Sequence, residues 1–73
     1  MPKSPKHRRL LGEAIRLHRR RAGLSQEKLA EKADLHPNFL GDIERGEENI
    51  SVDALVRLAS ALKVKVAALT DGF

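Results

Sequence analysis

The stretch that decides the fold runs from Leu29 to Gly46 and reads LAEKADLHPNFLGDIERG. Its apolar residues recur at helical spacing on either side of a break that starts near Asp34. Asp34 tolerates a left-handed backbone, and Pro37 fits the first position of a helix, where its missing N–H costs nothing. Helices of about two or three turns are marginal alone in water. The stretch therefore predicts two short helices, at 26–33 and about 37–45, joined as a helix-turn-helix.

Three further helices are predicted around this pair. The first covers roughly 8–22 and ends at a glycine, the fourth follows the cap residue Ser51, and a short fifth helix starts after Lys65. The only competing strand pattern is the short run 64–66. We therefore expect an all-α fold, a compact bundle of five short helices.

The N-terminus differs in composition from the rest of the chain. Residues 1–7 contain two prolines and no apolar periodicity, so we expect a flexible basic arm before a domain at 8–73. Residues 1–23 hold eight Lys and Arg and one acid, whereas 24–49 hold three basic residues and seven acids. A segregated basic segment is typical of a protein that binds a polyanion, although a solvated basic tail has the same composition.

Composition also limits the chemistry. The chain has 73 residues and no cysteine, so it is one small domain without disulfides or thiolate metal sites. Its three histidines lack a metal-binding spacing, and it has neither a glycine-rich phosphate loop nor a serine nucleophile motif. No apolar run could cross a membrane, and no apolar signal core is present. We expect a cytoplasmic protein that is not an enzyme and needs no metal or cofactor.

The segments LSQEKLA at 24–30 and IERG at 43–46 resemble the phage-repressor/Cro-type helix-turn-helix family. That family includes XRE-like regulators and restriction–modification controller proteins, and the similarity covers about residues 8–70. It implies a lambda-repressor-like fold and a sequence-specific transcriptional regulator that binds a palindromic operator in double-stranded DNA as a homodimer. The helix at 37–45 would enter the major groove. The alternative is an antitoxin or protein-interaction module of the same fold, with a toxin or another protein as partner.

The resemblance also assigns roles to individual residues. Gln26 matches a residue that bonds a DNA phosphate, and Arg19 matches an arginine that forms a structural ion pair with the residue matched by Glu44. The apolar C-terminal segment could cap the core or form a dimer seam, and we expect the seam, anchored by Val66, Leu69 and Phe73. The expected DNA-binding residues are Ser25, Gln26, His36, Pro37, Asn38, Phe39, Asp42, Arg45 and Asn49.

Base reading is expected from few side chains of the helix at 37–45. Asn38 is best able to make a bidentate contact, which favours adenine, and Asp42 could accept from cytosine N4. Arg45 is expected near the DNA backbone. Three of the expected DNA-binding residues also have a purely structural interpretation: Asn38 can be a solvated helix residue, Phe39 a cover for the core edge, and His36 a helix cap.

Overall fold

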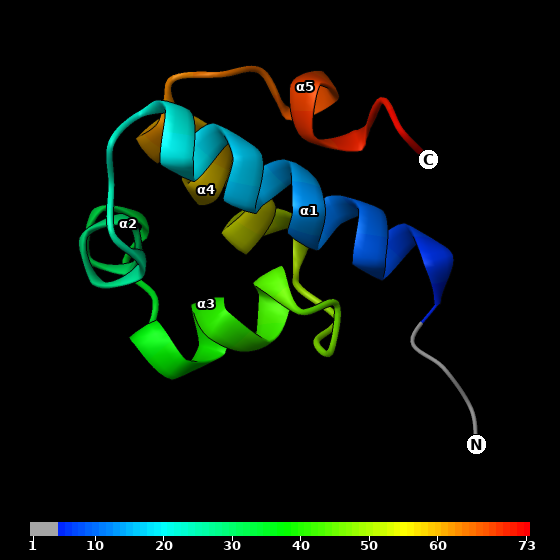
Figure 1. Cartoon of the computed structure of the whole chain (residues 1–73), viewed down its shortest axis with the longest axis horizontal. Coiled ribbons are helices and arrows are strands. Elements are labelled where there is room, and N and C mark those ends of the chain that lie inside the picture. Colours follow the sequence, from blue (N-terminus) through cyan, green and yellow to red (C-terminus); the bar gives the residue numbers. More distant parts are fainter. Residues whose placement is uncertain (1–4) are drawn as a thin grey trace.

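The computed structural model describes residues 5–73, and within them the chain forms five α-helices and no strand (Figure 1). The longest helix, α1, contacts α3, α4 and α5, and α2 contacts α3 and α4. The prediction of an all-α bundle that contains a helix-turn-helix, formed by α2 and α3, is confirmed. The helices are α1 (Lys6–Arg21), α2 (Gln26–Ala33), α3 (Pro37–Glu44), α4 (Val52–Leu62) and α5 (Val66–Thr70).

The helix ends differ from the predicted ends by at most two residues. Pro5 is the N-cap of α1, so Lys6 and His7, which we had assigned to the arm, belong to the helix. Both residues are exposed, and their turn therefore carries no apolar periodicity that could reveal it. The remainder of the predicted arm that precedes Pro5, residues 1–4, lies outside the described residues. Helix α3 ends at Glu44, with Arg45 as its C-cap.

Hydrogen bonds fix the turn between α2 and α3. Asp34 has φ 57° and ψ 49°, the left-handed conformation expected from the sequence. The N–H of Leu35 donates to the carbonyl oxygen of Ala30 at 2.8 Å, which closes the end of α2. At the start of α3, His36 Nδ1 accepts from the backbone N–H of Asn38 at 3.1 Å. The orientation of α3 is thus set locally as well as by the core.

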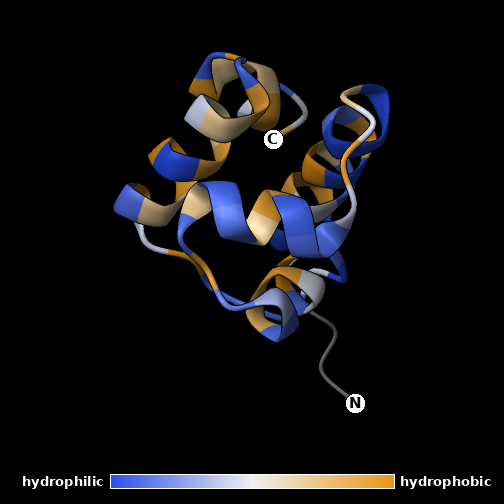
Figure 2. Cartoon of the chain, turned by 90° about the vertical axis from the view of Figure 1, so that its left-hand side faces the viewer, coloured by the Kyte–Doolittle hydropathy of each residue, from blue (hydrophilic) through white to orange (hydrophobic). Residues whose placement is uncertain are grey.

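The core lies between the helices, each of which carries hydrophobic and hydrophilic residues along its length (Figure 2). Burial of a large aliphatic side chain contributes about 1.5–3 kcal/mol. Leu40 and Ile43 of α3 belong to this core, and α3 packs directly on α1 and α2. The largest fully buried side chains are those of Ile15, Leu29, Leu40, Ile43, Leu58 and Leu69.

The position of Leu69 corrects one expectation. Its side chain is only 1% exposed and belongs to the core, because α5 packs on α1 and α4. Leu69 therefore caps the core, which was the alternative interpretation, and cannot anchor a dimer from the monomer surface. Val66 is half-buried against the same core, whereas Phe73 is 58% exposed.

Helix α1 crosses the end of α3 at a very close distance. A Cβ at Gly12 would lie 2.4 Å from the backbone oxygen of Ile43 and 2.6 Å from that of Glu44. Only glycine fits there unless the helices move apart. The sequence contained the signal, an isolated glycine inside a helical pattern, but we did not use it.

Candidate nucleic-acid interface

Helix α3 has one buried face and one open face. Leu40 and Ile43 are buried, as expected. The open face carries Asn38, Asp42 and Arg45, which are spaced three or four residues apart and so share one side of the helix. We call this surface the α3 face; it is a shallow depression lined by Gln26, Pro37, Asn38, Gly41, Asp42 and Arg45.

A buried carboxylate joins α1, α2 and α3 beneath the α3 face. Glu44 is 3% exposed, and Arg19 binds it through Nε (2.6 Å to Oε2) and Nη2 (3.0 Å to Oε1). The expected Arg19–Glu44 ion pair is therefore present. Arg19 Nη1 also donates to the carbonyl oxygen of Leu24 at 3.0 Å, and so ties α1 to the chain entering α2.

Gln26 is the second donor to this carboxylate. Its Nε2 donates to Glu44 Oε1 at 2.9 Å. Burial by itself raises the pKa of Glu44, but the hydrogen bonds from Arg19 and Gln26, with the charge of Arg19, outweigh it and leave the pKa below its ordinary value of 4.5. Glu44 is consequently ionised at neutral pH. It holds the Gln26 amide in place at the edge of the α3 face.

Arg45 forms a second charged cluster, on the exposed side. Its Nε donates to Glu47 Oε1 at 3.1 Å, and its Nη2 pairs with Asp42 Oδ1. Asp42 was expected to face a base, but in the free protein its carboxylate holds an arginine. Sequence analysis missed this cluster, although the spacing of Asp42 and Arg45, three residues apart on one helix, was a signal for it.

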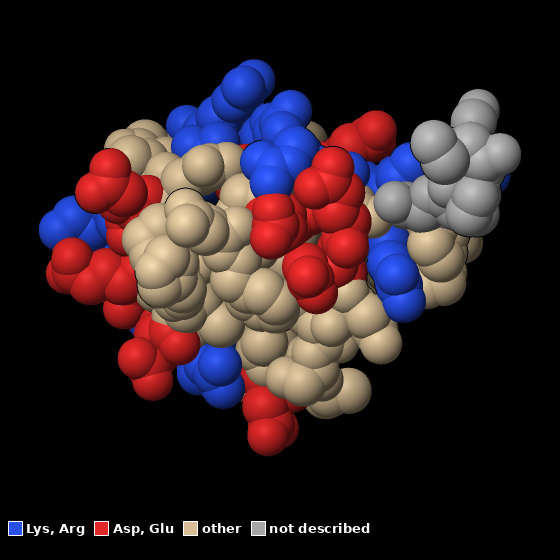
Figure 3. All heavy atoms as spheres, turned by 90° about the horizontal axis from the view of Figure 1, so that it is seen from below, with Lys and Arg blue, Asp and Glu red and all other residues tan. Residues whose placement is uncertain are grey.

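The surface around α3 is not uniformly positive. Figure 3 views the molecule from below Figure 1, the side on which α3 lies, and acidic side chains there stand directly beside basic ones. The formal charge of +4 is therefore not presented as one basic patch on this side. Any recognition through the α3 face must depend on the arrangement of individual groups.

Four other predicted site residues occupy three kinds of position. Ser25 and His36 cap α2 and α3, since Ser25 Oγ accepts from the Lys28 N–H at 3.0 Å. Phe39 is half-buried and packs against the core, in line with its structural interpretation. Asn49 lies away from the α3 face and lines a different pocket.

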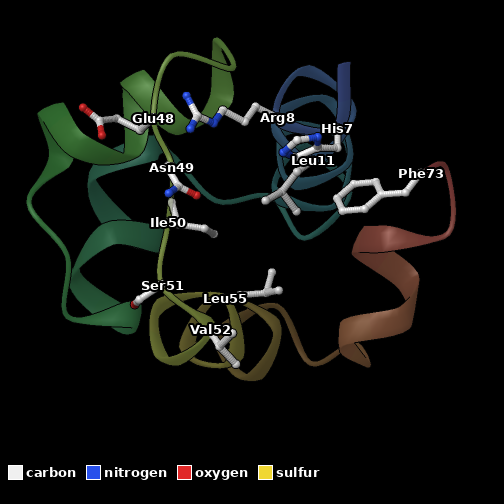
Figure 4. A pocket seen from close by; sticks show the side chains of 10 residues that line it. All are labelled: His7, Arg8, Leu11, Glu48, Asn49, Ile50, Ser51, Val52, Leu55 and Phe73. Atoms are coloured by element: carbon white, nitrogen blue, oxygen red, sulfur yellow. The ribbon is translucent and has the colours of Figure 1, made fainter. Parts of the chain in front are cut away.

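This second pocket lies between α1, α4 and the C-terminal residue (Figure 4). Its volume is about 150 Å³, and Leu11, Leu55 and Phe73 contribute apolar walls. The rings of His7 and Phe73 lie with centroids 6.0 Å apart and are tilted by 59° to each other. Val52, which is 74% exposed, also lines the pocket.

Residues 5–73 contain neither a cluster of metal ligands nor a membrane-spanning helix. No group of three or more possible ligands in this part of the chain could hold a metal ion. None of the five helices described above is long and apolar enough to cross a membrane.

The fold and the α3 face together define a helix-turn-helix protein. The sequence profile of the family described as helix-turn-helix matches residues 15–69. This chain belongs to that family of transcriptional regulators, which are not enzymes.

Three relatives illustrate the similarity. Control protein C.BamHI from Bacillus amyloliquefaciens is 42% identical over 65 residues, which are 88% of this chain and 80% of the relative. The structure of the restriction-modification controller protein C.AhdI from Aeromonas hydrophila is 35% identical, covers 85% of this chain and 94% of the other, and has a TM-score of 0.83. The structure of SinR, a Bacillus subtilis regulator, in complex with DNA is 35% identical over 81% and 95% of the two chains, with a TM-score of 0.77.

Proposed function

We propose that this chain is a cytoplasmic, sequence-specific DNA-binding transcriptional regulator that binds a palindromic operator as a homodimer, with α3 in the major groove. The observation that carries the proposal is the α3 face. Its polar side chains lie on a helix whose opposite face is buried in the core. In helix-turn-helix proteins, the N-terminal residues of this helix contact base edges. Membership of the helix-turn-helix family also supports a DNA-binding regulator.

Asn38 is the proposed adenine reader. It is exposed, lies in the first turn of α3 and has no place in the core. An asparagine amide can bind adenine N6 and N7 together. Gln26 is the proposed phosphate ligand: it lies at the N-terminus of α2, where backbone N–H groups favour an anion, and Glu44 fixes its amide.

A selection of binding sites from random double-stranded DNA tests this function. We expect a two-fold consensus, and we expect Asn38→Ala to cost about 1–3 kcal/mol on that consensus but little on random DNA. Glu31→Ala, an exposed change on α2, is the matched control. An Asn38→Ala variant that selects the parent's consensus with unchanged affinity would show that Asn38 does not read bases.

The homodimer requires a surface other than the α3 face. The exposed side chains of Val52 and Phe73 line the second pocket, and the exposed Val56 lies one helical turn after Val52 on α4; we propose these three as the seam in place of the buried Leu69. Two α3 helices of such a dimer would have to lie about 34 Å apart, one turn of DNA, to enter successive major grooves.

A second candidate function rests on the acids beside α3. Asp42 and Glu47 place negative charge where DNA phosphates would approach, which favours a protein partner, such as the toxin partner of an antitoxin. Gel shifts with genomic fragments and a pull-down from the same lysate separate the two. Capture of one protein without any shifted DNA would support the second candidate.

A further inference from the structure

Arg45 is folded back over the α3 face instead of extending into solvent. A Cβ on Gly41 would lie 3.3 Å from Arg45 Nη1 and 3.7 Å from Gln26 Oε1. The guanidinium therefore lies about one helical turn before its own Cα, above the only position of the face that lacks a side chain. The guanidinium of Arg45, a residue at the C-terminal end of α3, therefore lies in the middle of the α3 face.

The two carboxylates occupy one edge of this guanidinium. Nε donates to Glu47 and Nη2 pairs with Asp42, and these two nitrogens form the side edge of the group. Within residues 5–73, Nη1 has no hydrogen-bond partner. The end edge, with one N–H of Nη1 and the remaining N–H of Nη2 in parallel, is left to donate to a ligand. The Arg45 side chain as a whole is 51% exposed.

Two ligands on DNA accept a pair of parallel N–H groups: a phosphate, and guanine through O6 and N7. Their charges distinguish them here. Asp42 and Glu47 place two negative charges beside the guanidinium, which repel the full charge of a phosphate more strongly than the partial charges of guanine O6 and N7. The same carboxylates reduce the freedom that an arginine side chain loses on binding, and so favour a contact with fixed geometry.

We propose that Arg45 reads a guanine in each half of the operator, and that Asp42 and Glu47 act as positioning residues that hold its guanidinium for this contact. The proposal rests on the proposed DNA-binding function and adds the base and the residue that determine part of its specificity. It replaces the expectation that Arg45 contacts the backbone.

The test uses the full chain and the DNA site that the parent protein selects. Each guanine of that site is replaced in turn by 7-deazaguanine, which lacks the N7 acceptor but still pairs with cytosine. For the parent, we expect an affinity loss of about 5- to 150-fold at one guanine per half-site. For Arg45→Gln we expect that same replacement to have no further effect. Arg21→Gln is the control, because it removes the same charge from an exposed position on α1 and should keep the parent's sensitivity.

Asp42→Asn tests the positioning role. This variant keeps Arg45 but removes the carboxylate that holds its guanidinium, so we expect a smaller affinity loss on 7-deazaguanine than the parent shows. We also expect tighter binding to random DNA, because a charge that repels phosphates is gone. An Asp42→Asn variant with the parent's full sensitivity and unchanged affinity for random DNA would show that Asp42 does not position Arg45.

Other outcomes overturn the main proposal in distinguishable ways. If Arg45→Gln keeps the parent's loss at every 7-deazaguanine, another residue reads guanine, while DNA binding itself stands. If Arg45→Gln weakens selected and random DNA equally, Arg45 is a phosphate ligand. If the parent selects no DNA sequence, the proposed function fails and this inference fails with it.

Discussion

At the scale of single residues, Glu44 is the one charged residue in residues 5–73 that is buried. Its side chain is fully buried, and its partners are Arg16 and Arg19 of α1 and Gln26 of α2. We expect Glu44→Gln to cost about 3–5 kcal/mol of unfolding free energy, because it leaves the Arg19 charge buried and unpaired. Arg19→Met should cost a similar amount, and the double variant less than the sum. Urea unfolding of all three measures this coupling, and additive losses would contradict it.

The same carboxylate makes stability depend on pH. Glu44 has a folded-state pKa below 4.5, so its stabilisation is fully present above about pH 4.5 and is lost as the pH falls through the folded-state pKa. We expect the unfolding free energy of the parent to decrease in that acidic range. The decrease should be smaller in the Glu44→Gln variant, because glutamine does not titrate. Urea unfolding at successive pH values tests it; curves that stay parallel throughout would point to other carboxylates.

At the scale of elements, the crossing of α1 and α3 depends on Gly12. Gly12→Ala places a Cβ against two backbone oxygens, which cannot yield as a flexible side chain can. We expect a loss of about 1–3 kcal/mol, the usual cost of overpacking, together with weaker DNA binding because α3 is displaced. Gly72→Ala is the control, since a Cβ there meets nothing within 4 Å. Equal melting temperatures for both variants and the parent would contradict the close crossing.

The helix cap at His36 is an example of a feature that the sequence predicts well. The cap, the left-handed Asp34 and the ends of α2 are local features, and local residue preferences predict them. The Arg19–Glu44 pair spans 25 residues, and only the family resemblance indicated it. The isolated glycine in α1 and the spacing of Asp42 and Arg45 were local signals, but the backbone that meets Gly12 and the place of the Arg45 guanidinium over Gly41 depend on three-dimensional distances. Leu69 was misplaced because an apolar spacing does not say whether it faces the chain's own core or a partner.

At the scale of the whole molecule, the α3 face and the proposed seam are built from different elements. The first belongs to α2, α3 and the residues just after α3, and the second to α4 and the C-terminal Phe73. Both can therefore be occupied at once. A single domain of this size contacts few bases, so two copies in a fixed arrangement multiply its specificity without any new base contact.

The seam is tested most directly at Val56. It is 49% exposed and lies one turn after Val52 on the same side of α4. We expect Val56→Glu to raise the dimer dissociation constant, because two like charges would meet across a two-fold interface. The fold should be unaffected, since the side chain is outside the core. Light scattering over a range of micromolar concentrations measures the change.

Leu17→Glu supplies the matched control, because Leu17 is 47% exposed but lies on α1 and does not belong to the proposed seam. It should leave both the dimer and the DNA affinity near those of the parent. Val56→Glu should bind a palindrome no better than a single half-site, whereas the parent should prefer the palindrome. If the parent is a monomer that binds half-sites and palindromes equally well, the chain reads DNA as a single domain, and the exposed valines of α4 have another partner.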